Sequence, residues 1–123
     1  MNLSAQRADA IQAYRVKDFK TSAAIRKTIV DSSEYTPEDQ LYLGLSLLYQ
    51  SPPQANDAIM VFETILADDD VKSDEEARWF LALAYLQADQ VDAAKEVLQE
   101  IVDNNSWNAK NASEIITELE EID

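Results

Sequence analysis

The chain contains neither cysteine nor histidine among its 123 residues. Without cysteine it can form no disulfide and no thiolate metal site, and thiol usage says nothing about the redox state of its compartment. Without either residue type, common zinc sites, Ser-His and Cys-His nucleophilic pairs and imidazole acid–base catalysis are excluded. These absences favour a protein that is not an enzyme and that needs no metal and no cofactor.

Glycine, proline and long apolar runs are also scarce. Gly44 is the single glycine, and the prolines are Pro37, Pro52 and Pro53. Since glycine-dependent hairpins are almost unavailable, a chain rich in Ala, Leu, Glu, Gln and Ile is expected to form helices joined by tight turns. No run approaches the roughly 18 apolar residues that span a bilayer, and the N-terminus lacks a signal-peptide layout. We expect one soluble all-α domain over residues 1–123, in the cytoplasm or the periplasm.

The formal net charge of −14 limits the partners of the chain. Such a field repels phosphate backbones and anionic lipid headgroups, which disfavours nucleic-acid binding and direct membrane insertion. Basic or apolar partners remain possible, although high charge also serves solubility alone. The acidic run Asp68-Asp69-Asp70 lacks the alternating ligands, central glycine and distal glutamate of an EF-hand, so we expect a solvated turn there.

Helix start signals divide the chain into seven segments. The segments predicted to be helical are 3–16, 19–31, 37–50, 53–67, 74–87, 90–103 and 107–121. We expect N-caps at Thr36, Ser51, Ser73 and Asp89, and at Asn105 or Ser106 for the last segment. The loops are short, so consecutive helices are expected to be antiparallel neighbours.

An internal echo with a shift of 36 residues connects the middle segments. Tyr42-x2-Leu45-Ser46-x2-Tyr49 corresponds to Arg78-x2-Leu81-Ala82-x2-Tyr85, and Ala58-x3-Phe62 corresponds to Ala94-x3-Leu98. A period of this length, with a large-small-aromatic pattern followed by a small-large one, predicts helix-turn-helix units that bury their apolar faces by stacking. In this register Tyr42, Leu45, Ser46 and Tyr49 are expected to face the second helix of their own unit.

These residues resemble the tetratricopeptide repeat over 38–66 and 74–102. The segment Ala77–Tyr85 is similar to terminal repeats of bacterial members of the family. The resemblance implies a right-handed superhelix of about three helix pairs: a degenerate repeat at 3–36, repeats at 37–72 and 73–106, and a capping helix at 107–123. The chain departs from the family pattern: Pro53 and Asp89 replace the turn glycine, Arg78 replaces a large apolar residue, and the two extra residues per unit are expected within 67–72.

A second apolar stripe is the candidate binding surface. It lies about 100° around the helices from the echo residues. The resemblance implies that this stripe lines a concave groove for extended or helical peptides, whereas the alternative is ordinary core. The predicted partner-binding residues are Ile11, Tyr14, Leu43, Leu47, Gln50, Trp79, Leu83 and Leu86. The Lys, Asn and Arg clamp of chaperone-binding members is absent, which disfavours acidic chaperone tails as ligands.

The sequence therefore predicts a non-catalytic scaffold that binds a protein or peptide partner through an apolar, acid-rimmed groove. The alternative is a structural segment whose apolar face is covered by self-association, as in a homo-oligomer, or by the rest of a larger and possibly membrane-anchored protein. No glycine-rich phosphate loop and no fixed pair of carboxylates indicates catalysis.

Overall fold

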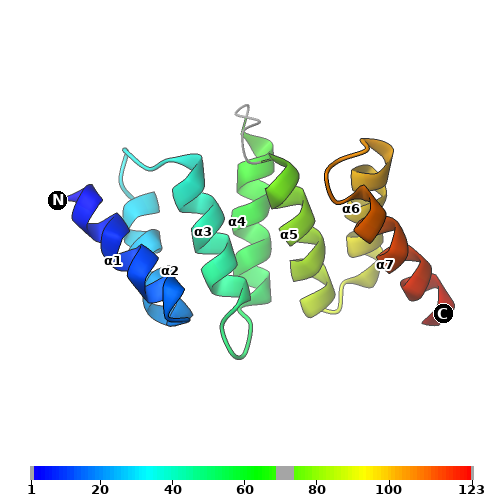
Figure 1. Ribbon diagram of the computed structural model, residues 1–123, viewed down its shortest axis with the longest axis horizontal. Helices are drawn as coiled ribbons and strands as arrows, with labels where there is room; N and C mark the ends of the chain where they lie inside the picture. The colour runs from blue at the N-terminus through cyan, green and yellow to red at the C-terminus, as the bar shows by residue number, and fades with distance from the viewer. Residues whose placement is uncertain (1, 69–73, 123) are drawn as a thin grey trace.

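The computed structural model describes residues 2–68 and 74–122, which form seven helices and no strand. The helices are α1 (Leu3–Arg15), α2 (Phe19–Val30), α3 (Pro37–Leu48), α4 (Ala55–Ala67), α5 (Asp74–Gln87), α6 (Val91–Asp103) and α7 (Ala109–Ile122). Each helix packs mainly against the helix before it and the helix after it, and Figure 1 shows them side by side from one terminus to the other. The predicted all-α, helical-hairpin fold is confirmed, with every boundary within two residues.

The start of α3 has the predicted cap. The backbone N–H of Asp39 donates to the Thr36 hydroxyl (3.2 Å), and the Asp39 carboxylate accepts from the backbone N–H of Thr36 (2.9 Å). Pro37 occupies the first helical position, where no N–H is needed. These reciprocal bonds satisfy two backbone donors and fix where the helix begins.

The other predicted caps are wrong or lie outside the described residues. No side chain caps α4 or α6, so neither Ser51 nor Asp89 has the predicted role. Asp89 instead has φ 60° in the turn before α6, which is the left-handed conformation that a turn glycine would adopt. Asn105 likewise has a positive φ of 49°, and α7 begins beyond it at Ala109. Ser73 is outside the described residues, as is most of 67–72.

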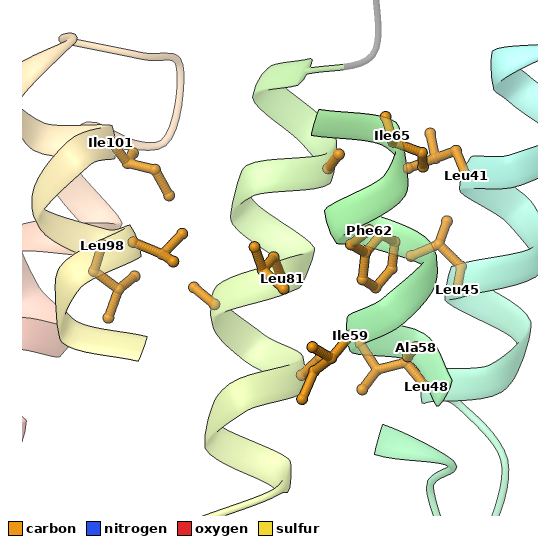
Figure 2. Packing of buried hydrophobic residues seen from close by; sticks show 14 of the residues in the cluster. Leu41, Leu45, Leu48, Ala58, Ile59, Phe62, Ile65, Leu81, Leu98 and Ile101 are labelled. Atoms are coloured by element: carbon orange, nitrogen blue, oxygen red, sulfur yellow. The ribbon is translucent and has the colours of Figure 1, made fainter. Parts of the chain in front are cut away.

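The hydrophobic core follows the helix stack from α3 to α7. Phe62, Leu98 and Ile101 are almost completely buried within it. In Figure 2 the Phe62 ring lies between α4 and α3, beside Leu45. The same ring stacks on Phe80 of α5, with 6.2 Å between the centroids. One phenylalanine thus joins three consecutive helices.

Gly44 is the point at which α3 approaches α4. A Cβ atom added to Gly44 would lie 2.5 Å from Cε1 of Phe62, so only glycine fits there without displacing the ring. The echo with a shift of 36 had assigned the small position of α3 to Ser46, which is wrong. Ser46 faces the preceding helix pair, because its hydroxyl lies 2.8 Å from that of Ser22 in α2.

The helix boundaries explain the error. In sequence, α5 begins 37 residues after the start of α3 and ends 39 residues after the end of α3. By contrast, both the start and the end of α6 come 36 residues after those of α4. The first helices are therefore related by about 38 residues, which pairs Gly44 with Ala82. The extra length lies in the turn between α3 and α4, which contains a cis Ser51-Pro52 bond. Tyr42 and Tyr49 are consequently turned away from α4, against Tyr14 and Phe19 at ring distances of 5.2 and 5.5 Å.

A buried ionic cluster joins α1, α2 and α3. Both carboxylate oxygens of Asp39 are bonded, one to Arg26 Nη1 and one to Arg7 Nη2, each at 2.7 Å. The Asp39 and Arg26 side chains are 1% and 4% exposed. The Arg26 guanidinium also lies over the Tyr42 ring, 5.3 Å from its centroid. Arg26 occupies the position in α2 that is equivalent to that of Phe62 in α4. Charge pairing therefore replaces apolar packing at this position of the first helix pair.

We expect Gly44→Ala to destabilise the protein, although alanine is the better helix former by about 1 kcal/mol. Overpacking against the buried Phe62 ring costs about 1–3 kcal/mol, which outweighs that gain. Urea unfolding of Gly44→Ala, Phe62→Leu and the double variant measures the coupling. In the Phe62→Leu background the alanine should be neutral or stabilising, and a stabilising effect in the native background would contradict the close approach.

Asp39 makes stability depend on acid pH. Burial raises the pKa of Asp39, but hydrogen bonds from Arg7 and Thr36 outweigh burial and lower it from 3.8 to about 2. Since the folded pKa is the lower one, this stabilisation is complete above the unfolded value and is lost as the pH falls towards 2. Between about pH 5 and pH 2 the free energy of unfolding should fall by about 2 kcal/mol more for the native protein than for the Asp39→Asn variant, as denaturant unfolding at each pH would measure. Asp31→Asn, at the exposed pair with Lys27, is the control and should behave like the native protein.

Candidate interaction surfaces

The first concave surface, here called the α2–α4 cavity, lies between the second helices of two pairs. It has a volume of about 520 Å³. Leu43 and Leu47 of α3 contribute to its lining, and Leu43 is only 3% exposed. The remaining lining residues are Ala23, Ala24, Lys27 and Val30 of α2, Gln40 of α3, and Asp57, Met60, Val61 and Thr64 of α4. Two of the predicted binding residues therefore belong to a surface formed with α2 and α4.

The second surface, here called the α3–α5 cavity, lies between the first helices of two pairs and has a volume of about 600 Å³. Its lining consists of Leu41, Tyr42, Leu45, Glu75, Glu76, Phe80 and Trp107. Leu41 and Leu45 precede Leu43 and Leu47 by two positions each, which is a rotation of about 200° around an α-helix. The two cavities thus lie on opposite sides of α3.

The other predicted residues are distributed along the first helices. Trp79 and Leu83 are half-buried and pack against the core, and Leu86 is half-buried near the end of α5. Ile11 of α1 is 48% exposed, and Tyr14 contacts the rings of Phe19 and Tyr42. Gln50 is half-buried in the turn after α3.

The corrected spacing brings most of these residues into one row. A shift of 38 relates Leu41 to Trp79 and Leu45 to Leu83, and a shift of 34 relates Ile11 to Leu45. Leu43, Leu47 and Gln50 do not belong to this row. We call the row on α1, α3 and α5 the first-helix face. It consists of Ile11, Tyr14, Leu41, Tyr42, Leu45, Trp79, Leu83 and Leu86.

Sequence reasoning missed the contribution of Trp107. Its side chain is 58% exposed in the loop before α7. Its ring lies 6.5 Å from that of Trp79, tilted by 57°. The loop between α6 and α7 therefore adds an exposed aromatic wall to the α3–α5 cavity. A signal was present, because a tryptophan between Asn105 and Asn108 has few apolar neighbours in sequence with which to pack.

Tyr14, Tyr49 and Tyr85 are uncharged at neutral pH, because the pKa of each is raised from its ordinary value of 10.0. Burial raises the pKa of Tyr14 and Tyr49. Burial, and then the hydrogen bond to Glu63 at 3.0 Å, raises the pKa of Tyr85. In the part of the chain that the structure describes, no group of acidic side chains could hold a metal ion, and no helix is long and apolar enough to cross a membrane. Asp69 and Asp70 lie outside that part.

This stack of antiparallel helix pairs is a helical-repeat architecture. The family model described as the tetratricopeptide repeat matches residues 54–106, which include α4, α5 and α6. This match supports the assignment to the tetratricopeptide repeat family that the resemblance predicted. Comparison with curated proteins and with solved structures gave no match.

The two tryptophans should report different environments. The Trp79→Phe variant retains only Trp107, and the Trp107→Phe variant retains only Trp79. We expect the fluorescence of Trp107 to have its maximum at a longer wavelength than that of Trp79. Acrylamide, which is neutral and therefore insensitive to the acidic field, should quench Trp107 more strongly. The opposite order would mean that Trp107 is covered in solution.

Proposed function

We propose that the chain is a protein-binding scaffold whose partner segment lies along the first-helix face. Tetratricopeptide repeats mediate protein–protein interactions and are typically non-catalytic, which supports the scaffold role. The observation that carries the choice of face is the row of apolar and aromatic side chains on α1, α3 and α5, with a concavity between α3 and α5. Leu41 and Leu45 of this row are buried, whereas its other members are at least partly exposed. Aromatic side chains in pockets are the usual centres of binding energy in protein interfaces.

The α2–α4 cavity supports a second candidate, self-association. Met60 is 66% exposed at this cavity, which is mostly apolar. In this alternative a second copy of the chain covers the cavity, and the protein is a structural homo-oligomer. Sedimentation at micromolar concentrations separates the two, because dimers that Met60→Lys dissociates would support self-association.

Two matched substitutions test the proposed face. Ile11→Lys and Met60→Lys each place one cation at an exposed apolar site, on the first-helix face and at the α2–α4 cavity respectively. Proteins captured by the immobilised native chain should lose about tenfold or more in affinity for Ile11→Lys and should bind Met60→Lys normally. Circular dichroism checks that both variants are folded. Loss of capture by Met60→Lys alone would contradict the proposal.

A further inference from the structure

The net charge of the chain is distributed unequally between its first and second parts. Residues 1–50 contain six cationic and six acidic side chains, whereas residues 51–123 contain four cationic and eighteen acidic ones. The whole net charge of −14 therefore belongs to the second part of the chain. In the first part the cations are balanced, and the buried Asp39 cluster uses Arg7 and Arg26 internally.

The α3–α5 cavity lies where these two halves meet. Leu41, Tyr42 and Leu45 of α3 form its neutral apolar side, and the first turn of α5 contributes two adjacent carboxylates, Glu75 and Glu76. Both glutamates are exposed, and neither forms an ion pair within residues 2–68 and 74–122. Arg78, the one cation of α5, is directed to Glu100 of α6 at 3.6 Å. The carboxylates at this cavity thus form no ion pair with a described cation.

The aromatic lining suits the same kind of ligand. Phe80 and the exposed Trp107 contribute to the wall of the cavity with Tyr42. Aromatic faces attract ammonium and guanidinium groups, and tryptophan does so most strongly. The long apolar stems of lysine and arginine also pack well on leucine and phenylalanine while their charged ends remain in water.

We propose that the α3–α5 cavity binds a lysine or arginine side chain from a partner segment that lies on the first-helix face. The aliphatic stem packs on Leu41, Leu45 and Phe80, the cation faces Trp107, and Glu75 and Glu76 pair with it. A volume of about 600 Å³ is within the range of about 300–1,000 Å³ that is common for ligand pockets. This inference rests on the proposed function, and it specifies the chemistry of the partner as apolar and basic rather than apolar alone.

A competing explanation is that the acidic half attracts any cation through its general field. A field effect would not depend on which carboxylates are removed, whereas a site would. The chain offers a matched control, because Glu118 and Glu121 of α7 are also exposed and lie together on a separate surface. Glu75→Gln/Glu76→Gln and Glu118→Gln/Glu121→Gln change the net charge by the same amount.

The probe is a synthetic mixture of nine-residue peptides, randomised among Ala, Leu, Phe, Gly, Ser, Lys, Arg, Asp and Glu. Peptides retained by the immobilised full chain are sequenced by mass spectrometry. We expect lysine or arginine beside leucine or phenylalanine to be enriched about threefold or more over the input, and acidic residues to be depleted. A retained peptide that is resynthesised should bind with a Kd raised about tenfold by Glu75→Gln/Glu76→Gln and by less than about twofold by the α7 pair.

Three results would overturn the proposal. They are enrichment of apolar peptides without cations, equal weakening by the two glutamine pairs, and absence of any retained peptide. None of these results decides the proposed function, because the Ile11→Lys and Met60→Lys comparison measures binding of protein partners independently of peptide charge. If that comparison succeeds and the peptide experiment fails, the scaffold role stands and the cationic ligand does not.

Discussion

The close approach of α3 to α4 at Gly44 determines how the rest of the stack is arranged. With no Cβ at this position, the Phe62 ring lies directly against the α3 backbone and still reaches Phe80 of α5. The contact also fixes the rotation of α3 about its own axis. Leu43 and Leu47 are thereby directed towards α2 and α4, and Leu41 and Leu45 towards the side of α5. One missing methyl group thus assigns four leucines of α3 to one of two surfaces.

Much of the fold could be predicted from sequence, because helix propensity, proline positions and turn spacing are local properties. The boundaries of all seven helices, to within two residues, and the N-cap at Thr36 required no knowledge of packing. The register that relates α3 to α5 was different. It depends on the length of the turn containing Pro52, and a turn can lengthen without changing the helices on either side. The echo between Ser46 and Ala82 was therefore chemically plausible and two residues out of register.

The candidate surfaces were affected by the same error. The predicted residues on α1 and α5 share one face, and they are Ile11, Tyr14, Trp79, Leu83 and Leu86. Two shifts of 36 residues relate α1 to α5 by the same 72 residues as the observed shifts of 34 and 38 together. Leu43, Leu47 and Gln50 were assigned to that face from the wrong register. Trp107 could not be placed from periodicity, because it precedes the helix and owes its position to the loop after α6. Periodic patterns place residues within a helix, but they do not place residues in turns.

The unequal distribution of charge gives the molecule a large electric dipole moment. Figure 1 shows α1 and α7 at opposite ends of the row of helices, so the neutral and acidic parts of the sequence are also separated in space. The field of a charged partner exerts a torque on such a dipole as well as an attraction. Near a cationic surface or partner the chain would therefore rotate before contact, so that its α7 end arrives first. Dissolved salt weakens this alignment, because screening shortens the field to about 8 Å at physiological ionic strength.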